Sequence, residues 1–170
     1  MKESRFSAEL RKDIKEILSL STKYVPHIYL IQDASRSGKK PYDFYFTHDK
    51  FFYAVEAKIE KGQSLNFKMV LDHQIDALLS CIASGKYKRG FVIVRLVHLK
   101  YNKQALIIPI KKWCKLLKKY SDKQKSIKID FLLQNHSDWF KMVNRKRFDE
   151  YNGTFWDVNE IINYYKKDRV

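Results

Sequence analysis

Apolar residues recur at helical spacing near the start of the chain and at strand spacing directly after it. Leu10, Ile14 and Ile17 are separated by charged residues within residues 6–20, and this spacing predicts an amphipathic helix. Three runs rich in aromatic and β-branched residues follow, each bounded by polar residues, and each predicts a strand. These runs are residues 27–33, 42–48 and 51–59.

The second and third of these runs are separated by little more than Asp49 and Lys50, so we expect them to form a hairpin. If these two residues make the loop, Asp43 falls opposite Glu56, with their Cβ atoms about 4.5–5.5 Å apart. Lys58 follows Glu56 by two residues and therefore shares its face of the strand. The pattern thus predicts two carboxylates and one lysine side by side.

The rest of the chain adds helices and strands. Residues 67–84 place apolar side chains on one helical face and end beside Gly85, a plausible C-cap. Residues 89–97 are almost continuously apolar, which is typical of a strand buried on both faces. This order predicts an α/β (or α+β) domain with a mixed central sheet. The remaining predicted elements are a strand at 104–110, a basic helix at 111–120, a short strand at 127–133 and a helix from Asp157.

The composition fits a single domain that binds a polyanion. The chain has 170 residues, 45% of them hydrophobic, and its 5 Gly and 3 Pro leave no linker. Lys and Arg number 34 against 19 Asp and Glu, and a net charge of +15 favours a nucleic-acid partner. Cys81 and Cys114 lack metal-ligand spacing and suit a reducing compartment. With no signal segment, membrane span or Gly-rich phosphate loop, we expect a cytoplasmic protein with no membrane partner or nucleotide cofactor.

The paired acids of the predicted hairpin suit a divalent cation. Directly opposed carboxylates destabilise a strand pair unless something compensates their charge. Asp43 and Glu56 would hold Mg²⁺, which acidifies a bound water and neutralises charge building on a phosphate, while Lys58 positions that water or stabilises the oxyanion. The plainer interpretation is a surface hairpin with solvated charges. We favour the metal site because apolar strand residues flank the acids in a strongly basic chain.

These residues also resemble a known family. Pro41-Tyr42-Asp43, followed after a gap by Glu56-Ala57-Lys58, is similar to the motif of the PD-(D/E)XK nucleases, and the predicted αβββαβ order is similar to their restriction-endonuclease-like core. The segments EAK, SLNF and DHQIDAL resemble more narrowly the Holliday junction resolvases of the RecU type. The resemblance covers about residues 5–110 of one nuclease domain, and residues 111–170 form a C-terminal extension without a match.

The resemblance implies a Mg²⁺-dependent endodeoxyribonuclease (with Mn²⁺ as a substitute) that acts on branched or structured DNA in recombination and repair as a homodimer. It implies that Asp43 and Glu56 are metal ligands, that Lys58 is catalytic, and that Gln74 supports the site. It also implies an acid on the first helix near the metal. The matching position is Glu9, with Glu16 a weaker choice, although acids in a first helical turn also compensate the helix dipole.

A set of polar and basic residues around the motif would contact DNA phosphates. For the basic loop before Asp43 and for His73, a solvated surface is the alternative interpretation. Two other functions stay open from the sequence: a non-catalytic DNA- or RNA-binding module on a nuclease-like scaffold, and a restriction or repair-type nuclease without junction specificity. The candidate DNA-binding residues are Arg36, Lys39, Lys40, Lys61, Lys68 and His73.

Overall fold

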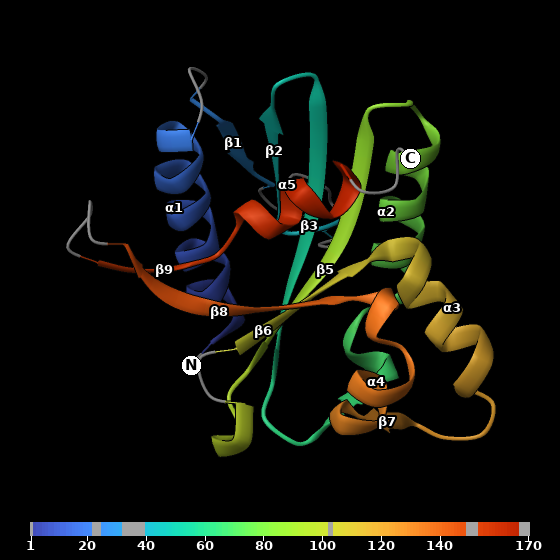
Figure 1. Cartoon of the computed structure of the whole chain (residues 1–170). Helices are drawn as coiled ribbons and strands as arrows, with labels where there is room; N and C mark the ends of the chain where they lie inside the picture. The colour runs from blue at the N-terminus through green and yellow to red at the C-terminus, as the bar shows by residue number, and fades with distance from the viewer. Residues whose placement is uncertain (1, 22–24, 32–39, 102–103, 149–152, 167–170) are drawn as a thin grey trace.

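A seven-stranded mixed sheet organises the fold (Figure 1). The computed structural model describes residues 2–21, 25–31, 40–101, 104–148 and 153–166. Neighbouring strands of this sheet are antiparallel, except that β3 and β5 are parallel. In spatial order the strands are β1 (His27–Leu30), β2 (Phe44–His48), β3 (Phe51–Glu60), β5 (Lys88–Leu96), β6 (Gln104–Pro109), β8 (Lys141–Phe148) and β9 (Gly153–Trp156).

Helices cover both faces of this sheet. The expected αβββαβ order and mixed sheet are confirmed, because α1 precedes the antiparallel strands β1 to β3, and α2 connects β3 to its parallel neighbour β5. A second, two-stranded sheet pairs β4 (Ser64–Asn66) with β7 (Ser126–Lys128). The helices are α1 (Glu3–Ser21), η1 (Phe67–Met69), α2 (Asp72–Ala83), η2 (Leu99–Tyr101), α3 (Ile110–Tyr120), α4 (Ile129–Asn135), η3 (Ser137–Trp139) and α5 (Asn159–Lys166).

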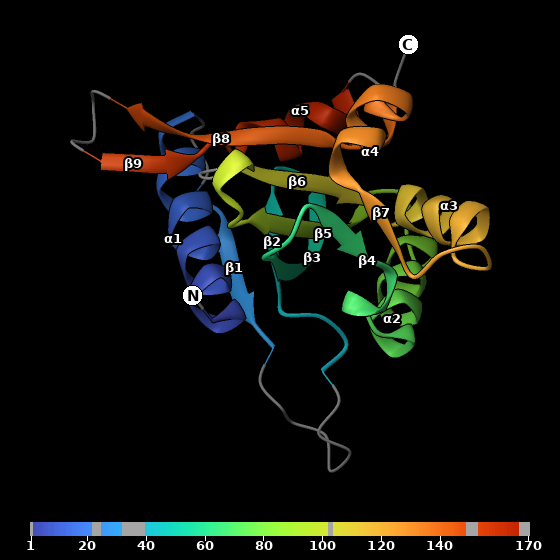
Figure 2. The ribbon, with the colours of Figure 1, turned by 90° about the horizontal axis from the view of Figure 1, so that it is seen from below.

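Alternation along β3 divides the core into two clusters. Val55 and Ala57 pack on one face with residues of α1 and α5, among them Leu10. Ala54 packs on the other face with residues of α2, α3 and α4, among them Trp113. We call these the α1 face and the α2 face. Figure 1 shows α1 and α2 on opposite sides of β3 and β5, and Figure 2 shows the same layers from below.

Strand β5 lies in the centre and is buried on both faces, as its continuous apolar sequence predicts. Val92 and Val94 enter the α2-face cluster, whereas Phe91 and Ile93 enter the α1-face cluster. Helices α2 and α3 approach this strand closely at Gly90. A Cβ placed there would lie only 3.2 Å from Ile110 Cγ2 and 3.3 Å from the Leu78 carbonyl oxygen, so a larger residue would force these neighbours to shift by a few tenths of an ångström.

The hairpin forms as the sequence predicts. Its pairs run from His48 with Phe51 to Phe44 with Val55, which is the predicted register. Asp49 occupies the turn with a φ of 53°, in the left-handed region that Asp tolerates better than most residues. Because a shift of one residue would send the acids to opposite faces, this turn determines the geometry of the site.

The C-terminal part differs from the prediction. The segment 127–133 is not one strand: its first residues complete β7, and α4 begins at Ile129. The pattern also missed β8 and β9, which extend the main sheet beyond β6. Strand β8 is rich in Lys and Arg and lacks the apolar alternation of a half-buried strand, so its sequence does not predict a strand. None of the helices in the described part of the chain is long and apolar enough to cross a membrane.

Candidate active site

Asp43 and Glu56 meet where strand β2 begins. The predicted register holds through the pair of Phe44 and Val55, and the Asp43 backbone N–H also donates to the Val55 carbonyl, at 3.1 Å. The Asp43 carboxylate then accepts a hydrogen bond from the Ala57 N–H at 2.9 Å (Oδ2). Asp43 therefore lies beside the stretch of β3 that has no β2 partner, and its side chain satisfies a backbone donor of that stretch.

Glu56 is the most deeply buried member of the group, at 1% exposure. Its Oε1 accepts from Lys58 Nζ at 2.8 Å and from Gln74 Nε2 at 2.6 Å. Gln74 also accepts the Leu71 N–H at 3.0 Å through its own Oε1, at the start of α2. One end of the Gln74 amide thus caps α2 while the other holds Glu56. We call Asp43, Glu56, Lys58 and Gln74 the carboxylate cluster.

Burial disfavours the charged form of both carboxylates, and the Asp43 charge adds to this effect at Glu56. Desolvation, followed by the nearby Asp43 charge, raises the pKa of Glu56 to about 7. Burial also raises the pKa of Asp43, although the Ala57 N–H and the Lys58 charge oppose that shift. Burial alone would lower the pKa of Lys58, but the Glu56 carboxylate outweighs it and the net shift is upward. Lys58 therefore stays an ammonium group between the two acids.

The donor set fits a divalent cation. Glu56 Oε2 is buried and has no hydrogen-bond partner among the described residues, which is costly for a carboxylate oxygen unless something else contacts it. The described part of the chain contains no group of three His, Cys, Asp or Glu side chains arranged around a metal. Two carboxylates are nevertheless a usual protein contribution for Mg²⁺, which keeps several waters and binds substrate phosphates. Asp43 and Glu56 are therefore the residues that would hold the ion.

Helix α1 brings two charged residues of one helical face, Glu3 and Arg11, near this cluster. Glu3 Oε2 lies 3.8 Å from Lys58 Nζ, and its charge is among the effects that raise the pKa of Glu56. The Arg11 charge is among those that hold down the pKa of Asp43. Ser7 lies between them in sequence and is buried. Its hydroxyl has no hydrogen-bond partner among the described residues. Spacing of four residues puts such side chains on one helical face, a signal that the sequence interpretation did not use.

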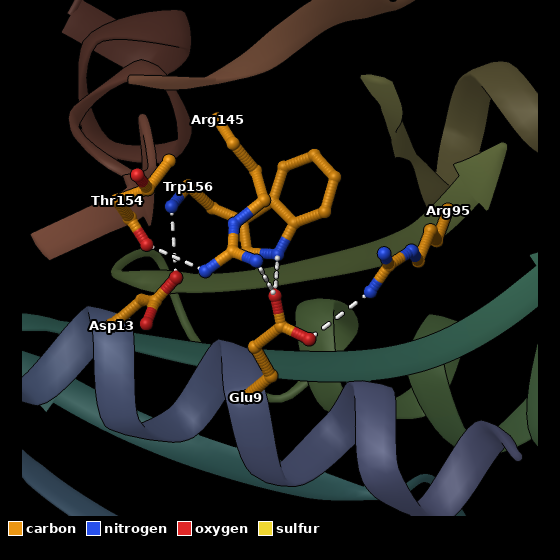
Figure 3. A network of polar contacts seen from close by, with 6 residues as sticks. All are labelled: Glu9, Asp13, Arg95, Arg145, Thr154 and Trp156. Carbon is orange, nitrogen blue, oxygen red and sulfur yellow. Dashed lines mark hydrogen bonds and ion pairs between the residues drawn. The ribbon is translucent and has the colours of Figure 1, made fainter. Parts of the chain in front are cut away.

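The structure does not bring Glu9 to the carboxylate cluster. Glu9 lies on the α1 face with two arginines: Oε2 is 3.0 Å from Arg95 Nη1, and Oε1 is 2.9 Å from Arg145 Nη1 (Figure 3). Its Oε1 also accepts from the indole Nε1–H of Trp156 at 3.1 Å, while the Trp156 backbone N–H donates to Asp13 at 2.8 Å. We call these five residues the Glu9 network. The weaker choice, Glu16, pairs with Lys12 of the same helix.

The expected DNA-binding residues are spread around the cluster. Lys40 is half-buried, and its charge is among the effects that hold down the pKa of Asp43. Lys61 and Lys68 are exposed beyond the end of β3, and His73 is half-buried at the start of α2. Arg36 and Lys39 lie outside the described residues.

Comparisons with known proteins find matches among solved structures. No family model and no curated protein matches the chain. Among solved structures, the Holliday junction resolvase Hjc from the archaeal hyperthermophile Archaeoglobus fulgidus superposes with a TM-score of 0.40 and 16% identity, covering 70% of this chain and 86% of that chain. At that level the likeness says nothing about the chemistry of this chain, which depends on its own residues.

Proposed function

We propose that the protein is a Mg²⁺-dependent endodeoxyribonuclease with its active site at the carboxylate cluster. The observation that carries this proposal is the pair of buried, adjacent carboxylates, one of which keeps an unpartnered oxygen beside a charged lysine. A structural ion pair does not need the second acid, since a further buried anion only adds repulsion. A site that binds a cation and a phosphate needs both acids and the lysine.

Each residue of the cluster has a distinct task. Asp43 and Glu56 would hold the ion, which when bound neutralises charge at the scissile phosphate and acidifies water. Gln74 fixes the Glu56 carboxylate from α2. Lys58 holds a proton on Nζ beside Glu56 and would orient the attacking water or stabilise the phosphate oxyanion. Glu3, not Glu9, is the acid of the first helix that we assign to this site, because it lies near Lys58.

A four-way junction is the substrate that we propose within this class. The support is the sequence resemblance over Glu56-Ala57-Lys58 and His73-Gln74, together with the net charge of +15. Resolution of a junction needs paired cuts in opposing strands, so a homodimer with two-fold symmetry follows from this proposal.

The test compares cleavage of a labelled four-way junction, a linear duplex and a single strand of the same sequence, in Mg²⁺ and in EDTA. Paired, metal-dependent nicks in the junction that are lost in Lys58→Ala would support a resolvase. Lys115→Ala is the matched control, because it removes an equal charge from an exposed position on α3.

Two other outcomes separate the alternatives. Equal cutting of the three DNAs would keep the nuclease and remove the junction role. Binding without cleavage in Mg²⁺ or Mn²⁺ would leave a non-catalytic nucleic-acid-binding module. Asp43→Asn should abolish cleavage and leave binding intact, because it changes one acid and none of the exposed cations.

A further inference from the structure

Three aromatic rings form a ladder across strands β1, β2 and β3. The rings of Tyr29 and Tyr45 stack with centroids 4.9 Å apart and planes 20° from parallel. Those of Tyr45 and Phe52 stack at 4.8 Å and 24°. Tyr29 lies on β1, an edge strand of the main sheet, and is 49% exposed, whereas the other two rings are half-buried. We call these residues the aromatic ladder.

The ladder shares a face of the sheet with the carboxylate cluster. Tyr45 pairs with Ala54, which belongs to the α2-face core, so the Tyr45 ring lies on that face. Asp43 precedes Tyr45 by two residues and Glu56 follows Ala54 by two, so the acids lie on the same side of the hairpin. Two residues along a strand span about 7 Å. The ladder therefore starts within about one nucleotide of the acids.

Positive charge continues from the far end of the ladder. Lys88 pairs with Phe52 across β3 and β5, and its Nζ lies 5.7 Å from the centre of the Phe52 ring. Lys88 also lines a pocket of about 560 Å³. Besides Ile82, Ala83, Ser84, Gly85 and Ile110, the residues around this pocket are Lys86, Lys88, Arg89 and Lys111, so the described lining holds four cations and no carboxylate. We call it the basic pocket.

We propose that this face binds an unpaired DNA strand, with bases stacked on Tyr29 and Tyr45 and phosphates held at the basic pocket. This inference rests on the proposed nuclease function and narrows its substrate to DNA with single-stranded bases beside the cut. Aromatic rings along a positively charged groove are how proteins bind single strands without sequence preference, since every base offers a π-face. In a paired duplex the bases stay stacked on each other and cannot use the rings.

Cross-strand stacking also stabilises a hairpin, and this contribution alone would explain Tyr45 and Phe52. It explains Tyr29 less well, because an aromatic ring half in water on an edge strand loses much of its burial energy. Lys88 and Arg89 of the basic pocket lie over the hairpin rings Phe52 and Phe51, but support of the hairpin does not account for four cations around one pocket. The joint placement of exposed ring, acids and cations on one face favours a bound strand.

The test measures binding of a short fluorescein-labelled oligothymidylate by fluorescence anisotropy, in EDTA and at fixed salt. Tyr29→Leu keeps an apolar strand residue but removes the π-face, and Tyr29→Phe retains it. Phe131→Leu is the matched control, because Phe131 is a ring of similar exposure (40%) on α4, away from the ladder. Thermal unfolding of each variant checks that the fold is kept.

We expect Tyr29→Leu to weaken single-strand binding roughly tenfold. Tyr29→Phe and Phe131→Leu should bind as the wild type does, and the affinity of Tyr29→Leu for a paired duplex should stay within about twofold of the wild type, since phosphate contacts dominate there. Unchanged single-strand affinity in Tyr29→Leu would overturn the inference, as would equal losses for single strand and duplex. Because binding is measured without metal, absence of cleavage in Mg²⁺ would defeat the nuclease proposal and leave this result standing.

Discussion

Two buried groups of charged side chains lie in this molecule, the carboxylate cluster on the α2 face and the Glu9 network on the α1 face, and they are partnered differently. In the Glu9 network each oxygen of Glu9 contacts an arginine, and the Trp156 N–H groups satisfy Glu9 and Asp13. In the carboxylate cluster two acids lie together with Lys58, and Glu56 Oε2 has no partner in the described chain.

We interpret this difference as that between a structural group and the proposed active site. The carboxylates of Glu9 and Asp13 have partners in Arg95, Arg145 and Trp156, and these contacts join α1 to β5, β8 and β9. In the carboxylate cluster both acids are buried and the Asp43 charge raises the pKa of Glu56, so we expect the two acids to attract a cation. The same Glu→Gln change should therefore lower activity in the carboxylate cluster and lower stability in the Glu9 network.

The largest expected effect is on cleavage. Glu56→Gln should lower the rate of DNA cleavage in Mg²⁺ by about 10²–10³-fold or more, because it removes a charge that serves the transition state. Glu9→Gln should leave the rate near that of the wild type at a temperature where both are folded. Single-turnover nicking of a labelled junction measures both. Equal losses in the two variants would show that the groups do not divide the work in this way.

The two variants should rank in the reverse order in the free energy of unfolding, with the larger loss in Glu9→Gln. Glu9→Gln leaves Arg95 and Arg145 facing an uncharged amide, and we expect a loss of about 2–3 kcal/mol, at the lower end for a broken buried pair because Glu9 keeps some exposure. Glu56→Gln should be as stable as the wild type or more so, because burial and the Asp43 charge both disfavour the ionised form of Glu56 in the folded protein. Urea denaturation compares the two, and a larger loss in Glu56→Gln would contradict the assignment.

Asp13 of the Glu9 network gives a pH-dependent test. Desolvation raises the pKa of Asp13 to about 6, against the lowering effects of the Trp156 N–H and Arg145. The folded protein therefore binds this proton more tightly than the unfolded chain, and the stabilisation that the proton provides is complete below the unfolded pKa and lost as the pH rises through about 6. In Asp13→Asn this pH dependence should disappear, while the amide oxygen still accepts from Trp156.

Urea denaturation at about pH 4 and pH 7 measures this change, and the free energy of unfolding at pH 4 relative to that at pH 7 should fall by roughly 2 kcal/mol in Asp13→Asn. Asp130→Asn is the control of opposite sign. The Lys100 and Tyr101 side chains bond to Asp130 and lower its pKa, so the stabilisation from its charge is lost as the pH falls. If stability depends on pH in Asp13→Asn as it does in the wild type, the folded protein does not hold a proton on Asp13.

Local rules predicted the carboxylate cluster better than the Glu9 network. A loop of two residues and strict alternation set the hairpin register, so Asp43 and Glu56 follow from adjacent sequence. The contact of Glu9 with Arg145 depends on how α1 is rotated against the sheet and on a strand far away in sequence. The pairing of β8 with β6 in turn depends on tertiary contacts that no local pattern in its basic sequence records.

The smallest expected effect concerns Glu3, the acid of α1 that we assign to the proposed site. Glu3 is 53% exposed and lies 3.8 Å from Lys58, so its charge is partly screened by water. Glu3→Gln should lower the rate of cleavage by only about two- to fivefold, without a measurable change in stability, because exposed ion pairs contribute little to folding. Glu16→Gln is the matched control on the same helix. An effect in Glu16→Gln equal to that in Glu3→Gln would mean that α1 acts through its overall charge and not through a residue placed beside Lys58.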